Sequence, residues 1–134
     1  MKFAVVANPS KYEVKEVIHS TIQWAEKTNG HLLLCKEVCE LLSIQASDSL
    51  SITDSDKASI ETCDVVLVMG GDGTILYTAR ISKKSNKPIL GINSGRLGFM
   101  TNIQSDELEE ALNLLLKGEY TLDKRHYLKA IDNQ

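Results

Sequence analysis

Residues 65–74, with the sequence VVLVMGGDGT, join an apolar run to a glycine-rich turn. The run at 65–69 is rich in β-branched residues and has no polar position, which predicts a parallel strand buried on both faces. Gly70 and Gly71 permit backbone angles that end such a strand, and Thr74 is predicted to cap the helix that follows. Because the first turn of a helix presents unpaired N–H groups and a positive dipole end, this stretch predicts an anion site.

Asp72 places a negative charge inside this predicted anion site. A site that only held phosphate would avoid a carboxylate, because like charges a few ångströms apart repel each other. We therefore interpret Asp72 as a residue that accepts the proton of an attacking hydroxyl group or holds Mg²⁺, and both roles belong to phosphoryl transfer. The alternative is a plain turn residue, since Asp-Gly is a common turn dipeptide. The position behind a buried strand favours the functional interpretation.

Composition indicates one soluble globular domain in a chain of 134 residues, of which 43% are hydrophobic and 25% charged. The net charge of −3 argues against a general electrostatic attraction to nucleic acid or to an anionic membrane. The sequence shows no signal region and no apolar stretch of about 20 residues, so we expect a cytoplasmic protein. The three cysteines cannot all pair, and we expect them to be reduced packing residues.

Apolar runs alternate with helical patterns along the chain. We expect strands at residues 3–7, 31–35, 64–69 and 89–92, helices at 14–25, 36–42, 74–84 and 105–116, and a loop or short irregular helix at 43–59. This alternation predicts an α/β fold with three layers, α/β/α, and a mostly parallel sheet. In such sheets ligands bind beyond the carboxyl ends of the strands, where the glycine stretches fall.

A second glycine-rich stretch, GINSGRLGFM, occupies residues 91–100. Asn93 can donate and accept hydrogen bonds, Gly98 lets the backbone approach a ligand, and Phe99 offers a face on which a base can stack. The alternative is that Phe99 is a core residue and the glycines are ordinary turns. The spacing is not the Gly-x-Gly-x-x-Gly fingerprint, so a dinucleotide-dependent dehydrogenase is poorly supported.

Together, the two glycine stretches resemble those in the N-terminal part of the NAD kinase family, ATP-dependent enzymes that phosphorylate the 2′-hydroxyl of the adenosine ribose of NAD. Residues 70–74 match the glycine-aspartate signature of the family, and residues 91–101 match its second motif, with methionine at Met100 where leucine or tyrosine is common. Phosphofructokinases and diacylglycerol and sphingosine kinases share the first motif, which alone indicates only phosphoryl transfer. The pair of motifs is more specific.

The resemblance implies a Rossmann-like nucleotide-binding domain at residues 1–118 and the start of an all-β domain at 119–134. It implies that Asp72 is catalytic and accepts the proton of the ribose hydroxyl. The substrates would be ATP, or inorganic polyphosphate in some members, and NAD, with Mg²⁺ or another divalent cation and with metal ligands that the motifs do not identify. The full-length form would be a homo-oligomer. The implied nucleotide-binding residues are Gly71, Asp72, Gly73, Thr74, Tyr77, Asn93, Gly98 and Phe99.

The chain departs from the family pattern in its length. In the family, an all-β half supplies an Asn-Glu pair for the NAD ribose and a further glycine-rich loop, and neither occurs before Gln134. We therefore expect an incomplete and largely inactive fragment, because phosphoryl transfer depends on positioning and surrounding charge. Two alternatives stay open: a lipid kinase domain of the diacylglycerol or sphingosine type, and a nucleotide-binding module without catalysis.

Overall fold

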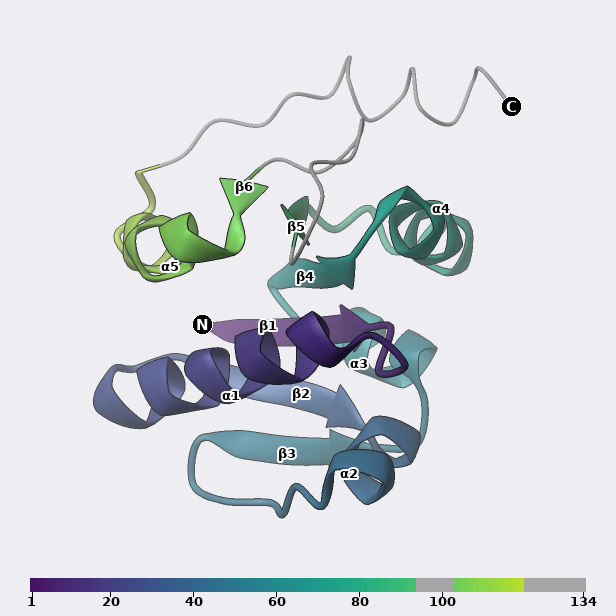
Figure 1. Ribbon diagram of the computed structural model, residues 1–134. Coiled ribbons are helices and arrows are strands. Elements are labelled where there is room, and N and C mark those ends of the chain that lie inside the picture. Colours follow the sequence, from purple (N-terminus) through teal and green to yellow (C-terminus); the bar gives the residue numbers. More distant parts are fainter. Residues whose placement is uncertain (94–102, 120–134) are drawn as a thin grey trace.

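The computed structural model describes residues 1–93 and 103–119 (Figure 1). Six strands form one sheet in the order β3-β2-β1-β4-β5-β6, and every pairing between these strands is parallel. The strands are β1 (Lys2–Ala7), β2 (His31–Cys35), β3 (Leu50–Thr53), β4 (Val65–Gly70), β5 (Ile89–Asn93) and β6 (Ile103–Gln104). The helices are α1 (Tyr12–Lys27), α2 (Lys36–Leu42), α3 (Asp56–Thr62), α4 (Asp72–Ile81) and α5 (Leu108–Leu116), with a short 3-10 helix η1 (Ser105–Glu107) before α5.

Helices cover both faces of the sheet, which confirms the three-layer α/β prediction. Alternate residues of β1 point to opposite faces, so Phe3 packs in the core beneath α1, α2 and α5, whereas Ala4 packs in the core beneath α3 and α4. All six residues of β4 are buried, as its unbroken apolar sequence predicts. The sheet centre is made of β1 and β4, the two middle strands of the order, and helices cover both of their faces (Figure 1).

The prediction of a loop or short irregular helix at 43–59 is wrong for residues 50–53, which form β3, and for residues 56–59, which begin the regular helix α3. β3 is an edge strand of four residues, and its alternation is weak because Ile52 is 42% exposed while Leu50 is buried. The start of α3 did carry a local signal that the prediction missed. Ser55 is its N-cap, and the side-chain oxygen of Ser55 accepts a hydrogen bond from the Ala58 N–H at 3.1 Å.

The predicted helix starts also need correction. The helix predicted at 74–84 is α4 and begins at Asp72, so its N-cap is Gly71 and not Thr74. The helix predicted from Ser105 begins as η1, and the residue that caps it is Gln104. Both corrections are shifts of one to three residues at a helix end, where local sequence preferences are least decisive.

Trp24 ties α1 to α5. It is buried, its ring meets Phe3 edge to face with centroids 5.6 Å apart, and its Nε1–H donates to Asn113 Oδ1 at 2.9 Å. A buried indole N–H needs such an acceptor.

The cysteines are free and buried, as expected, and burial raises the pKa of the Cys63 thiol. Within the described residues, no helix is long and apolar enough to cross a membrane.

The strand order places a topological switch point between β1 and β4. The chain leaves β1 for α1 on one face of the sheet and leaves β4 for α4 on the other face. Ala7 pairs with Met69 at the ends of these strands, and the Asn8 N–H donates to the Met69 carbonyl at 3.1 Å. Ligands of doubly wound sheets bind in the crevice that opens at such a point.

Gly70 is expected to be the residue on which this crevice depends. Its φ of +158° lies in a region that only glycine adopts readily, and a Cβ there would meet Thr74 Oγ1 at 2.6 Å. The variant Gly70→Ala should therefore lower the free energy of unfolding by about 3 kcal/mol, from backbone strain and overpacking combined. Urea unfolding of the chain, followed by circular dichroism, measures the loss.

Gly73→Ala is the matched control for this prediction. A Cβ at Gly73 meets no protein atom within 4 Å, and Gly73 lies in α4. The free energy of unfolding should stay the same or rise by up to about 1 kcal/mol, because alanine is the better helix former. Equal stabilities for the two variants would contradict the role given to Gly70.

Candidate active site

The switch point forms a pocket of about 470 Å³ at the carboxyl edge of the sheet. One wall comes from the end of β1 and the turn into α1, and the other comes from the turn after β4 and the first turns of α4. The size is in the range of small-ligand sites. Its lining residues are Ala7, Asn8, Pro9, Lys11, Gly71, Asp72, Gly73, Thr74 and Tyr77.

Five of the eight nucleotide-binding residues predicted from the sequence line this pocket together: Gly71, Asp72, Gly73, Thr74 and Tyr77. Asn93 lies nearby, since its Cα pairs in register with that of Gly70, but it is buried and its amide nitrogen donates to Gln104 Oε1 at 3.5 Å. Gly98 and Phe99 lie outside the described residues, as do residues 120–134. The predicted roles of Gly98 and Phe99 stay predictions.

The first turn of α4 presents its backbone to the pocket. The Gly71 carbonyl accepts the N–H groups of Thr74 at 3.1 Å and Ile75 at 3.2 Å, so the helical hydrogen-bond ladder starts with these two residues. Gly73, one residue earlier, is exposed, and its missing side chain leaves open space within 4 Å. This geometry gives an anion access to the positive end of the helix dipole.

Asp72 is the first residue of α4 and is half-buried in the pocket. A carboxylate at a helix N-terminus stabilises the helix by roughly 0.3–1 kcal/mol, which alone gives Asp72 a structural role. That role does not require a pocket, however, whereas the structure places this carboxylate in the wall of one. Asp72 is the only acidic residue among the described residues that line it, so any carboxylate chemistry in this part of the pocket falls to Asp72.

Asn8 holds the opposite wall of the pocket in shape. Its side-chain oxygen accepts the Ser10 hydroxyl at 2.7 Å and the Ser10 N–H at 3.3 Å, and its carbonyl accepts the Lys11 N–H at 3.3 Å. These bonds turn the chain after Pro9 and bring Lys11 over the glycine turn. Lys11 Nζ lies 3.4 Å from the point where a Cβ of Gly71 would stand. Sequence reasoning missed Lys11, although a lysine two residues after Asn8-Pro9 at a strand end was an available signal.

Tyr77 joins the pocket to α3. Its hydroxyl donates to Asp56 Oδ2 at 2.9 Å, and partial burial together with Asp56 raises the pKa of Tyr77 to about 12. Cys35, at the end of β2, lies beside the same carboxylate, and burial with a smaller contribution from the charge of Asp56 raises the pKa of its thiol to about 11. The contact fixes α4 against α3, so it also fixes the helix that carries Asp72.

Comparison with known proteins decides the family. The model of the ATP-NAD kinase N-terminal domain matches residues 3–120, which is most of the chain. The chain belongs to the NAD kinase family. The match includes the glycine turn after β4 and every described residue that lines the pocket.

Individual NAD kinases agree with the family match. The chain is 41% identical over 126 residues to the NAD kinase of Pseudomonas fluorescens and 38% identical over 99 residues to that of Clostridium kluyveri. These alignments cover 94% and 74% of this chain but only 41% and 34% of the relatives. The chain thus spans about two fifths of the length of the curated NAD kinases that it matches.

A solved structure of yeast NADH kinase, complexed with NADH, has the same fold. It superimposes with a TM-score of 0.78 at 17% identity and covers 89% of this chain and 36% of the yeast chain. At this identity the likeness confirms the α/β fold and its strand arrangement. It confirms no individual role for a residue of this chain.

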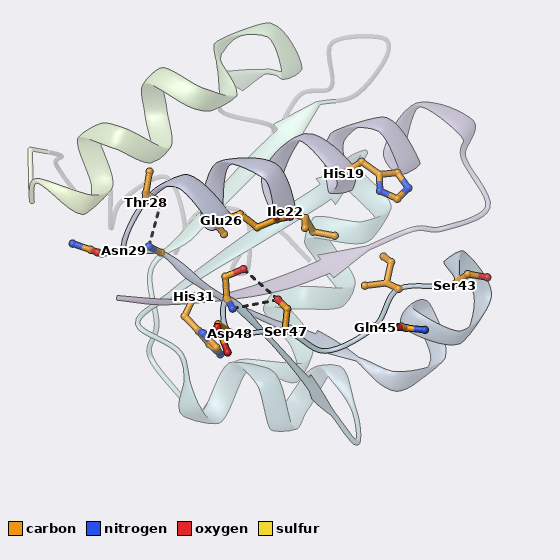
Figure 2. Close-up of a pocket in the computed structure, with 14 residues that line it drawn as sticks. His19, Ile22, Glu26, Thr28, Asn29, His31, Ser43, Gln45, Ser47 and Asp48 are labelled. Atoms are coloured by element: carbon orange, nitrogen blue, oxygen red, sulfur yellow. Dashed lines mark hydrogen bonds between the residues drawn. The ribbon is translucent and has the colours of Figure 1, made fainter.

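A larger groove, of about 720 Å³, lies between α1 and the loop from α2 to β3 (Figure 2). It sits toward the amino ends of β2 and β3, away from the glycine turn, and shares no lining residue with the NAD kinase motifs. His19 and His31 lie toward opposite ends of it (Figure 2), and His31 Nε2 is hydrogen-bonded to Ser51 Oγ at 2.7 Å. The described residues contain no group of three or more side chains suited to a metal. The smaller pocket is the candidate active site because the residues of the glycine-aspartate motif line it.

The Tyr77–Asp56 contact predicts a pH-dependent part of the stability. Because the pKa of Tyr77 is raised from 10.0 to about 12, the contact contributes fully below pH 10 and is lost as the pH rises through 12. Tyr77→Phe should lower the free energy of unfolding by about 0.5–1 kcal/mol at neutral pH. The difference from the unmodified chain should shrink as the pH rises through this range, measured by urea unfolding at each pH.

Tyr12→Phe is the control, because it removes a phenol that is 70% exposed and outside this contact. The unfolding series is repeated with this variant. A pH dependence that is the same for Tyr12→Phe and Tyr77→Phe would contradict the stabilising contact with Asp56.

Proposed function

We propose that this chain forms the nucleotide-binding part of an NAD kinase, in which the terminal phosphate of ATP or polyphosphate passes to the 2′-hydroxyl of the adenosine ribose of NAD. The observation that carries this proposal is the pocket at the switch point, where Asp72 stands beside the open start of α4. A helix start favours phosphate and a carboxylate can take a proton. Membership of the NAD kinase family makes NAD the acceptor of choice.

Asp72 is proposed as the general base. Carboxylates as a class are weak bases toward sugar hydroxyl groups, so the proton moves late, as the oxygen bonds to phosphorus. The open backbone beside Gly73 would lie against the phosphates, and Thr74 and Tyr77 would border the nucleotide. Asn93, Gly98 and Phe99 are proposed to complete the nucleotide site from the second glycine stretch, with Phe99 at the adenine.

Asp72 also fits a divalent cation. Mg²⁺ is usually held in proteins by one or two carboxylates and by phosphates of the substrate, not by a cage of protein ligands. A single carboxylate in the pocket proposed for the phosphates meets this requirement, and Asp72 is the described residue that would hold the ion. When bound, Mg²⁺ would neutralise charge on the phosphate oxygens.

We further propose that residues beyond this chain complete the enzyme. The relatives are more than twice as long as the region that they share with it, and residues 119–134 would begin the second, all-β domain. The complete protein is proposed to be a cytoplasmic homo-oligomer whose partners are small nucleotides, without nucleic-acid or membrane partners. On this view the chain alone binds nucleotides and has little kinase activity.

Asp72→Asn tests the general base. We expect NADP formation to fall by about 10²–10⁴-fold while NAD affinity is retained, because the amide keeps the size of the side chain but cannot take the proton. The assay uses this chain continued by the remaining part of the Pseudomonas fluorescens NAD kinase. Asp48→Asn, an exposed carboxylate in the larger groove, is the matched control and should keep full turnover. Full turnover in Asp72→Asn would reduce Asp72 to a turn residue.

Gly73→Ala tests whether nucleotide lies against the first turn of α4. The added methyl group meets no protein atom within 4 Å, so any loss of affinity must come from contact with the ligand. We expect calorimetry to show about tenfold weaker ATP binding, the cost of displacing one charge-assisted hydrogen bond. Unchanged affinity would place the phosphates elsewhere.

The two alternatives have their own outcomes. Offering NAD and a lipid alcohol such as diacylglycerol to the extended protein separates an NAD kinase from a lipid kinase by which acceptor becomes phosphorylated. Nucleotide binding by calorimetry without any NADP formation in the extended protein would favour a binding module. The family match argues against the lipid kinase.

A further inference from the structure

Lys11 stands out in the candidate active site because its position is unfavourable for the helix that it begins. Lys11 is the N-cap of α1, a helix of 16 residues, and it provides no side-chain hydrogen bond to cap that helix. Ser, Thr, Asp and Asn are the preferred residues there, and a positive charge at the N-terminus opposes the helix dipole. A residue that breaks a local rule without a structural gain points to a functional reason.

The position of the ammonium group supplies that reason. Lys11 Nζ lies over Gly71, at 3.4 Å from the point where a Cβ would stand, so a side chain at Gly71 would crowd it. Gly71 is the N-cap of α4. The ammonium group of the exposed Lys11 side chain therefore lies at the start of α4, across the pocket from its own helix.

Positive charge outweighs negative charge in this pocket. Lys11 is the only cationic side chain among the described residues that line the pocket, and Asp72 is the only anionic one. The N-termini of α1 and α4 both open onto the same pocket and add positive dipole ends. With one carboxylate set against an ammonium group and two helix starts, the pocket favours a ligand with several negative charges.

We propose that Lys11 binds an oligophosphate and holds it against the start of α4. This inference rests on the proposed function and adds to it the residue whose positive charge offsets the negative charge of Asp72. An ammonium group that donates to phosphate oxygens forms a charge-assisted hydrogen bond, and it offsets the repulsion that Asp72 would otherwise exert on them. The oligophosphate can be the triphosphate of ATP or the pyrophosphate of NAD, which share the same phosphate oxygens.

Calorimetry on the chain with inorganic tripolyphosphate, ATP and NAD tests this proposal. Lys11→Met, which keeps the length of the side chain and removes its charge, should weaken tripolyphosphate binding about tenfold, the value of one such bond at an exposed site. Lys11→Arg keeps the charge and should stay within about threefold. The matched control is Lys27→Met, which removes a lysine at the other end of α1 and should leave binding unchanged.

The titrations with ATP and with NAD identify which substrate supplies the phosphates. A loss confined to ATP assigns Lys11 to the donor, and a loss confined to NAD assigns it to the acceptor; both support an oligophosphate contact. Equal binding of tripolyphosphate by Lys11→Met and the unmodified chain overturns the role of Lys11 and leaves the proposed function standing. If the unmodified chain binds neither tripolyphosphate nor either nucleotide, the pocket is not the nucleotide site and both proposals fail.

Lys11→Ser separates binding from folding. Lys11 has the extended backbone of an N-cap, with φ −90° and ψ 127°, so serine can cap α1 without rearrangement. The urea midpoint should therefore rise while tripolyphosphate affinity falls. A variant that is more stable and binds as tightly as the unmodified chain would overturn the proposal, because the lysine would then serve neither the fold nor the ligand.

Discussion

The parallel pairing of β1 with β4 is the interaction on which the rest of the structure depends. Both strands are buried on their two faces, and helices leave their carboxyl ends in opposite directions across the sheet. That divergence opens the pocket, and it brings the turn at Asn8 and the turn at Gly70 side by side. The site is therefore a product of topology, because neither turn could form it alone.

The apolar strands were predictable because each is a short, nearly continuous hydrophobic run, a pattern that fits a buried strand better than a loop or an amphipathic helix. Residues 65–69 are an example, since a five-residue apolar run ended by glycines fits a central strand and little else. β3 was missed because an edge strand buries only part of its side chains, so its pattern resembles that of a loop. Its place in the sheet is decided by the register between Leu32 and Leu50, which no local pattern contains.

The residues of the candidate site also differ in whether the sequence alone could predict them. Gly71, Asp72, Gly73 and Thr74 are contiguous, so a motif can identify them and their shared pocket follows from one turn. Lys11 comes from a different part of the chain, and its approach to Gly71 depends on how the strand ends are paired. Thr74 shows a different limit of sequence-based prediction. Its residue type favours an N-cap, but the N-cap of α4 is Gly71. The Thr74 hydroxyl group instead faces Gly70 and leaves no room for a side chain there.

The central pairing also has a consequence for synthesis on the ribosome. Lys2 and Asp64 exchange two hydrogen bonds at the start of β1 and β4, the Lys2 N–H to Asp64 Oδ2 at 2.7 Å and the Asp64 N–H to the Lys2 carbonyl at 2.8 Å, across 62 residues of chain. The β1-α1-β2-α2-β3 portion emerges first and must wait with an open edge on β1. Parallel sheets with such distant partners fold slowly. Until β4 is made, that edge offers unpaired backbone groups with which another polypeptide can pair.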